Sequence, residues 1–198
     1  MIIGMSRLNR VLNVEGLDTL LILLAPRQIF PIRTRKNMND LEIHQPVTGA
    51  TVDLKQAKVA VRHVPDKPGV AAKLFGALSK ANISVDMIIQ AVQENQTNDI
   101  AFTVNEDDLD QTVEITKQIG EIIEAKDVIF DRNVAKVSIV GVGMIGTPGI
   151  AADMFQALAE NNINIEMIST SEIKISCVVS QEQAKDALKV IHDHFVIH

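Results

Sequence analysis

The sequence of 198 residues contains no tryptophan, no tyrosine and a single cysteine. Six phenylalanines are its only large aromatic side chains. The core must therefore be built mainly from aliphatic residues, which make up most of the 46% hydrophobic content. Cys177 cannot form a disulfide within the chain, which favours a reducing compartment and predicts a cytoplasmic protein. Because Cys177 lies in an alternating apolar run, we interpret it as a small buried side chain.

Long apolar runs and clusters of basic residues are also missing. The longest apolar run, residues 20–25, is far shorter than the roughly 20 residues that a transmembrane helix needs. The net charge of −6 argues against nucleic acid and against a membrane surface as partners. There is no P-loop, no nucleophile elbow and no metal-ligand spacing of cysteine and histidine. We therefore predict no catalytic residues, no metal and no cofactor.

One segment of the chain occurs twice, 80 residues apart. Residues 68–88 and 148–168 align without a gap and share eleven identities. The identical pairs are Pro68/Pro148, Gly69/Gly149, Ala71/Ala151, Ala72/Ala152, Phe75/Phe155, Ala77/Ala157, Leu78/Leu158, Asn82/Asn162, Ile83/Ile163, Met87/Met167 and Ile88/Ile168. Agreement of this extent in one register indicates two copies of one structural unit.

Both copies show the same succession of periodicities. A first strand, at 59–61 in the first copy and 137–139 in the second, is followed by an amphipathic helix. Two alternating strands come next, at 83–89 and 100–104 with a turn at residues 95–98 in the first copy, and at 163–167 and 173–179 in the second. A second helix follows, and the first copy ends in a fourth strand at 128–130. We expect Pro68 in the first turn of its helix and Thr147 with Pro148 at the cap of the matching helix. The order βαββαβ is that of the ferredoxin-like arrangement. The predicted fold class is therefore α+β, with two such units, antiparallel sheets and helices on one face.

The same pattern predicts the domain boundaries. Residues 56–132 form the first unit and residues 133–198 the second, while residues 1–45 show no clean period and are treated as a poorly defined lead-in. The second copy stops before it can form a complete fourth strand. A strand within residues 46–55 has no place in the first unit. We therefore expect it to complete the sheet of the second unit, so that the first unit is inserted between this strand and the rest of the second.

The loop of the second copy contains Gly141, Gly143 and Gly146 in the spacing G-x-G-x-x-G. This spacing is typical of dinucleotide sites, where the glycines open a helix that carries the pyrophosphate. Here Pro148 starts the helix after the glycines, the first copy has no glycine at the matching loop, and the chain lacks further βαβ units. A dinucleotide-dependent enzyme is therefore the less favoured alternative.

The junction before the first helix is a better candidate for a ligand site. Residues 66–71 put free backbone N–H groups at a helix start, where Gly69 permits close approach and the helix dipole favours a carboxylate. An amino acid also carries an ammonium group, for which Asp66 and the side chain of Gln90 could supply acceptors. The alternative interpretation is a plain helix start with no ligand.

Several segments carry a family resemblance. They are D-x-P-G-x-A at residues 66–71, D-M-I-I-Q at 86–90, T-N-D-I-A-F-T at 97–103, V-S-I-V-G-V-G-M at 137–144 and I-N-I-E-M-I-S-T-S-E-I-K-I-S at 163–176. Each unit resembles the ACT domain, a small-molecule sensor with the βαββαβ fold. Over residues 46–198 the chain resembles the C-terminal regulatory part of aspartate kinase.

The resemblance implies binding of lysine, threonine or both, and feedback inhibition within the aspartate pathway of amino-acid biosynthesis. It also implies a homodimer through ACT units, with each effector between the first unit of one chain and the second unit of another. The implied effector-binding residues are Asp66, Pro68, Gly69, Ala71, Gln90, Asn164 and Ile165. Ser171 and Glu172 match positions near a second, lysine-type contact.

The resemblance also bears on activity. Aspartate kinase transfers a phosphoryl group from ATP to aspartate, but its nucleotide and aspartate motifs are absent here, and residues 1–45 do not supply them. The chain would thus be inactive alone and would act with an aspartate kinase catalytic chain, like a regulatory beta subunit, with residues 1–45 a lead-in or kinase remnant. The alternative is a free-standing two-ACT regulator of gene expression or of another metabolic enzyme.

Overall fold

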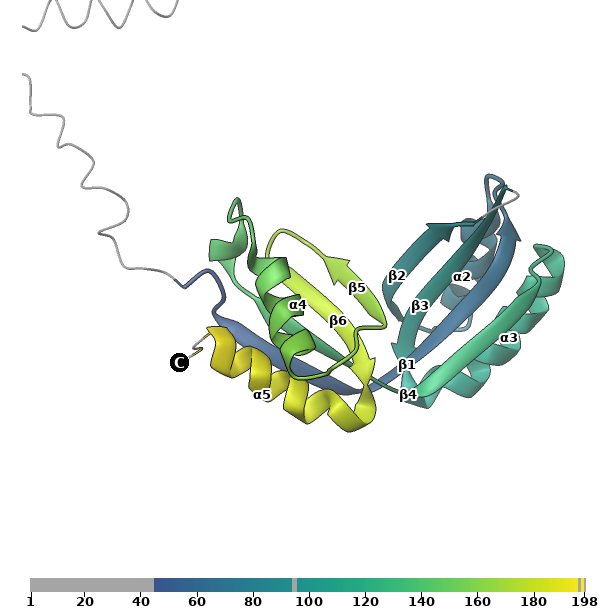
Figure 1. Cartoon of the computed structure of the whole chain (residues 1–198). Helices are drawn as coiled ribbons and strands as arrows, with labels where there is room; N and C mark the ends of the chain where they lie inside the picture. Colours follow the sequence, from purple (N-terminus) through teal and green to yellow (C-terminus); the bar gives the residue numbers. More distant parts are fainter. Residues whose placement is uncertain (1–44, 94–95, 196, 198) are drawn as a thin grey trace, which may run out of the picture. The chain divides into compact units, whose positions relative to one another are not determined.

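The computed structural model describes residues 45–93, 96–195 and 197. The predicted lead-in at residues 1–45, which includes the apolar run at 20–25, lies outside these residues except for Gln45. The described chain contains one six-stranded sheet in the order β2-β3-β1-β4-β6-β5, in which every neighbouring pair is antiparallel (Figure 1). The strands are β1 (Gly49–Pro65), β2 (Val85–Val92), β3 (Thr97–Asn105), β4 (Asp127–Val140), β5 (Met167–Thr170) and β6 (Lys174–Ser180). The helices are α2 (Val70–Lys80), α3 (Leu109–Ile122), α4 (Ile150–Glu160) and α5 (Ala184–Phe195), with short 3₁₀ turns η3 (Glu106–Asp108), η4 (Val142–Met144) and η5 (Gln181–Gln183).

The two central strands run through both copies of the repeat. The sequence predicted separate strands near 46–55 and 59–61, and again near 128–130 and 137–139, but each pair is one continuous strand, β1 of 17 residues and β4 of 14. The later half of β1 pairs with the early half of β4, from Lys58 opposite Asp131 to Arg62 opposite Asp127. The two expected sheets are therefore joined into one.

The early half of β1 belongs to the second unit. Gly49 lies opposite Val140 and Asp53 opposite Lys136, next to the strand that begins the second copy. The ladder shifts register on both sides of Gln56, where β1 passes from one unit to the other. Residues 49–53 thus pair with residues 136–140, and the boundaries at 46–55 and 56–132 stay a prediction from the sequence.

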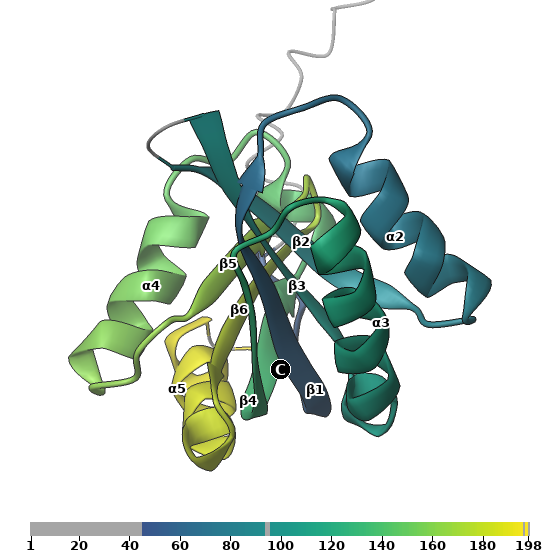
Figure 2. The ribbon, with the colours of Figure 1, turned by 90° about the vertical axis from the view of Figure 1, so that its right-hand side faces the viewer.

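Each unit has its own aliphatic core between its half of the sheet and its pair of helices. The core of the first unit includes Val59, Leu74 and Phe102, and that of the second includes Ile139 and Met154. Figure 2 shows α2 beside α3 and α4 beside α5, each pair against its own strands. Burying one such large aliphatic side chain contributes about 1.5–3 kcal/mol, so these interiors account for the stability of both units without tryptophan or tyrosine.

Both first helices begin at a left-handed glycine. The residue before α2 is Gly69, with φ of 94°, and the residue before α4 is Gly149, with φ of 102°. The placement of Pro68 in the first turn was wrong, because it precedes this glycine, and Thr147 does not cap α4: its Oγ1 donates to the carbonyl of Gly143 at 2.7 Å. The described side chains leave both helix starts uncapped.

Cys177 lies on β6 with no exposed surface, in the core of the second unit. The interpretation as a small buried side chain is confirmed. Burial raises the pKa of the Cys177 thiol to about 12, because the thiolate loses its hydration there. Among the described residues, no helix has the length and apolar character needed to cross a membrane.

We expect Cys177 in the folded chain to resist a thiol-specific disulfide reagent at pH 8, because nearly all of the thiol is protonated there. In denaturant the thiol regains an ordinary pKa of about 8.5 and should react rapidly. Labelling followed by absorbance against denaturant concentration measures this, and the transition should coincide with loss of circular dichroism. Complete labelling within seconds in buffer alone would contradict the buried placement.

Candidate functional site

The loop between β1 and α2 is held by a buried asparagine. Asn98 Nδ2 donates to Asp66 Oδ1 at 2.9 Å, and the Asp66 N–H donates to the carbonyl of Gln96 at 2.9 Å. Asn98 is only 3% exposed, and its Oδ1 has no hydrogen-bond partner among the residues that the structure describes. A buried amide oxygen without a partner costs about 1–3 kcal/mol, so it needs a reason.

Sequence reasoning missed Asn98 because it assigned residues 95–98 to a turn. The structure instead starts β3 at Thr97, and Asn98 alternates inward with Ile100, Phe102 and Val104. A polar residue at an inward position of an otherwise apolar strand is the signal that could have found it. Next to it, Asp99 holds the end of β1, since Asp99 Oδ1 accepts from the His63 N–H at 2.7 Å.

Four of the predicted effector-binding residues lie together at the start of α2. Asp66, Pro68, Gly69 and Ala71 are all exposed there, and no described side chain caps the helix. The free N–H groups of a first turn and the positive end of the helix dipole attract a carboxylate. Asp66 places a negative charge beside them, so this end of the unit offers partners for both charges of an amino acid.

Gln90 reaches the same end of the first unit from β2. It lies opposite Ile100 of β3, and the next pair but one joins Val92 to Asn98. Residues directly opposite in an antiparallel pair share a face, so Gln90 lies on the helix-covered face with Ile100. The structure thus places Gln90 near the end of the sheet that carries Asp66 and Asn98.

The remaining predicted residues lie in the second unit. Asn164 is exposed and Ile165 packs against the core of that unit, in the segment between α4 and β5. The strand expected over 163–167 begins only at Met167, although the Glu166 N–H already donates to the carbonyl of Val178 at 2.8 Å. Within one chain these residues belong to a different unit from the loop.

Ser171 and Glu172 line a groove of about 380 Å³ at the start of α4, together with Ile145, Thr147 and Gly149. The Ser171 N–H donates to the carbonyl of Lys174 at 2.7 Å and closes the turn between β5 and β6. The groove is the counterpart, in the second unit, of the loop that precedes α2.

The two counterparts differ in chemistry. The repeat aligns Asp66 with Gly146, and the strand registers align Asn98 with Ile173. Ile173 is 49% exposed, whereas Asn98 is buried. The second groove therefore lacks the carboxylate–amide pair, and its acceptors are Ser171 and Glu172 from the turn between β5 and β6.

The glycine-rich loop of the second copy is packed against the chain itself. A Cβ on Gly141 would lie 2.0 Å from the carbonyl oxygen of Pro46, and one on Gly143 would lie 2.8 Å from the Pro46 Cα. Val47, the next residue, is 1% exposed in the core of the second unit. Gly141 and Gly143 thus accommodate residues 45–47, whereas Gly146 has a φ of 71° and open space around it. In the described ranges no cluster of three potential metal ligands occurs.

Replacing Gly141 with alanine should destabilise the chain by about 1–3 kcal/mol, because both the loop and Pro46 must shift to admit the methyl group. The matched control is Gly76→Ala in α2, where a Cβ meets nothing within 4 Å. There the gain in helix propensity should stabilise by about 0.5–1 kcal/mol. Urea unfolding measures both. Equal stabilities for Gly141→Ala and the unmodified chain would contradict the packing described.

The comparisons with known proteins agree with this architecture. ACT domain models match residues 59–124 and residues 137–195, so the chain is a tandem ACT-domain protein. Aspartokinase of Pseudomonas aeruginosa is 47% identical over 154 residues, which are 77% of this chain and 37% of that protein.

Solved structures give the same assignment. The ligand-free regulatory subunit of aspartate kinase from Thermus thermophilus is 43% identical with a TM-score of 0.71, over 76% of this chain and 99% of that one. A crystal structure of aspartokinase alpha and beta subunits gives 48% identity and a TM-score of 0.71, over 76% and 99%. The chain belongs to the family of aspartate kinase regulatory subunits. It spans only 37% of the length of Pseudomonas aeruginosa aspartokinase.

Proposed function

We propose that this chain senses lysine, threonine or both and mediates feedback inhibition of an aspartate kinase. The observation that carries the proposal is the Asn98–Asp66 pair beside the uncapped start of α2. A buried amide that holds a carboxylate at a helix start is what recognition of an amino acid backbone needs. The family of the chain supports the same conclusion.

The proposed contacts follow from charge. The carboxylate of the effector binds the N–H groups at the start of α2, next to Gly69 and Ala71, and its ammonium group binds Asp66 and the Gln90 side-chain oxygen. Asn98 keeps Asp66 in place through Nδ2, and its Oδ1 gains a donor when the ligand binds. The free-energy cost of burying Asn98 Oδ1 without a partner would then be offset when the ligand binds.

The other side of the site comes from a second copy of the chain. Asn164 and Ile165 lie in the second unit, so in a homodimer they would cover the loop of the first unit of the other copy. Ser171 and Glu172 would then serve a second contact with a lysine-type side chain at the start of α4. Such a two-fold contact uses the same surface from both chains.

The kinase activity itself belongs to a partner in this proposal. The described residues have the ACT units alone, and the relatives named aspartokinase are much longer. Effector binding would shift the catalytic chain between active and inhibited states through a difference in affinity for the two. The compartment would be the cytoplasm, where the amino acids are made.

Isothermal titration of the full chain with lysine and with threonine tests the proposal. At least one of them should bind, and a ligand at 100 times its dissociation constant should raise the free energy of unfolding by about 2.7 kcal/mol. Alanine and glutamate serve as controls for non-specific binding. A folded chain that binds neither lysine nor threonine would refute the proposal.

Asn98→Leu should abolish or strongly weaken effector binding while leaving the unliganded stability unchanged or higher, because it removes a buried unsatisfied oxygen. The matched control is Thr116→Val. Thr116 on α3 is fully buried, and its Oγ1 also has no partner in the described part of the chain. The control should raise stability without changing affinity. Equal affinity in both variants, measured by calorimetry, would exclude Asn98 from the site.

A further inference from the structure

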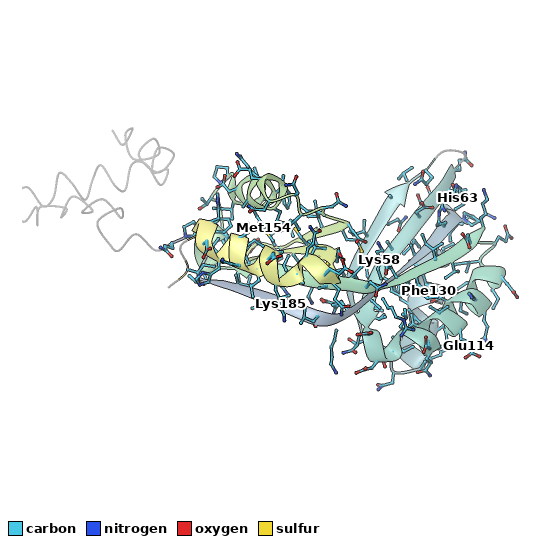
Figure 3. The ribbon with its side chains drawn as sticks, turned by 60° about the horizontal axis from the view of Figure 1, so that its bottom comes forward. Lys58, His63, Glu114, Phe130, Met154 and Lys185 are labelled. Atoms are coloured by element: carbon cyan, nitrogen blue, oxygen red, sulfur yellow. The ribbon has the colours of Figure 1, made fainter. Side chains whose placement is uncertain are left out.

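Two ion pairs join the units across the strands of the sheet. Lys58 of β1 contacts Glu166 of the second unit, and Lys136 of β4 contacts Asp86 of the first. Three of the four side chains are shielded, with 23% of Lys58, 22% of Glu166 and 11% of Lys136 exposed, whereas 41% of Asp86 is exposed. Figure 3 labels Lys58 where the two units meet. Salt therefore screens the Lys58–Glu166 pair, which is part-buried on both sides, less than it screens a fully exposed pair.

The two ion pairs are equivalent to each other through the repeat. Asp86 and Glu166 are 80 residues apart and occupy the same position of the repeat. Lys58 and Lys136 each precede a fully buried valine, in the first strand of its unit. Each unit therefore contributes the lysine to one pair and the acid to the other, in the self-complementary manner of a two-fold interface.

An apolar cluster accompanies the two pairs. Met87 and Met167, each the residue after one of the acids, pack with Val134 and Val178 on the sheet face opposite the helices. These two methionines are also equivalent in the repeat. The contact between the units thus has a buried centre with charged pairs around it, and both occur in duplicate.

Both acids stand beside segments of the proposed effector site. Asp86 precedes Gln90 on β2, which is an edge strand whose pairing with β3 shifts register between Val85 and Ile88. Glu166 directly follows Asn164 and Ile165, in a segment that lies outside the strands and is tied to β6 by the Glu166 N–H. Each acid therefore lies in a segment with few regular backbone hydrogen bonds to the neighbouring strand.

We propose that Lys58 and Lys136 are positioning residues of the effector site. Lys136 fixes Asp86 and hence the course of β2 up to Gln90. Lys58 fixes Glu166 and hence the segment that presents Asn164 and Ile165. One contact between the units thereby sets the geometry of both halves of the site, and effector affinity depends on it. This inference rests on the proposed function.

A charge-swap experiment on the full chain tests it. Lys58→Glu should weaken lysine or threonine binding by about tenfold, the scale of coupling between contacting residues. Exchanging both charges, in Lys58→Glu with Glu166→Lys, should restore most of the affinity, and Lys58→Arg should retain it. The control is Lys55→Glu on the same strand as Lys58, which breaks an exposed ion pair with Asp107 of η3 and should leave affinity unchanged. Calorimetry measures affinity, and circular dichroism verifies folding.

The possible results distinguish a failure of the positioning role from a failure of the proposed function. If Lys58→Glu does not fold, Lys58→Met removes the charge at similar length and takes its place. Lowered melting temperatures with unchanged affinity in Lys58→Glu and in the corresponding Lys136→Glu variant would overturn the positioning role and leave the proposed function standing. If the unmodified chain binds neither amino acid, the proposed function fails and this inference fails with it.

Discussion

The pairing of β1 with β4 is the interaction on which the rest of the structure depends. Each strand spans both units, so the two halves of one ladder form the central pairs of two different cores. The helices of each unit cover only their own half of the sheet. Because the backbone bonds of this ladder are continuous, neither unit can shift along the other without breaking strands, and the register shifts at Gln56 are confined to the crossing point.

Duplication supplied this framework, and divergence at a few positions supplied chemistry. The helix starts are the same in both copies down to the left-handed glycine. What differs is the set of side chains around them: a carboxylate and an amide in the first unit, Gly146 and Ile173 in the second. The identities between the copies therefore preserve the fold, and the differences include the side chains to which we assign recognition.

Much of this could be read from the sequence, and the exceptions have physical causes. The repeat, the element order and the family were predicted because periodicity and motif are local properties of the chain. The fusion of strands was missed because Asp53 and Gln56 look like a boundary, although pairing with β4 carries the strand through them. Asn98 was missed because its polar neighbours resemble a turn. Its part in the proposed site depends on its burial and on its hydrogen bond to Asp66, which are properties of the tertiary structure.

The insertion of one unit into the other has a consequence for how the chain is made. Thr48 bonds to the carbonyl of Val140, 92 residues further along, so the first strand of the second unit is synthesised long before its partner. The first unit can fold as soon as it leaves the ribosome, while residues 49–53 wait as an unpaired strand edge. Long-range pairing of this kind is slow and exposed to aggregation. Folding of the second unit is therefore the step of biogenesis at which a chaperone would matter most.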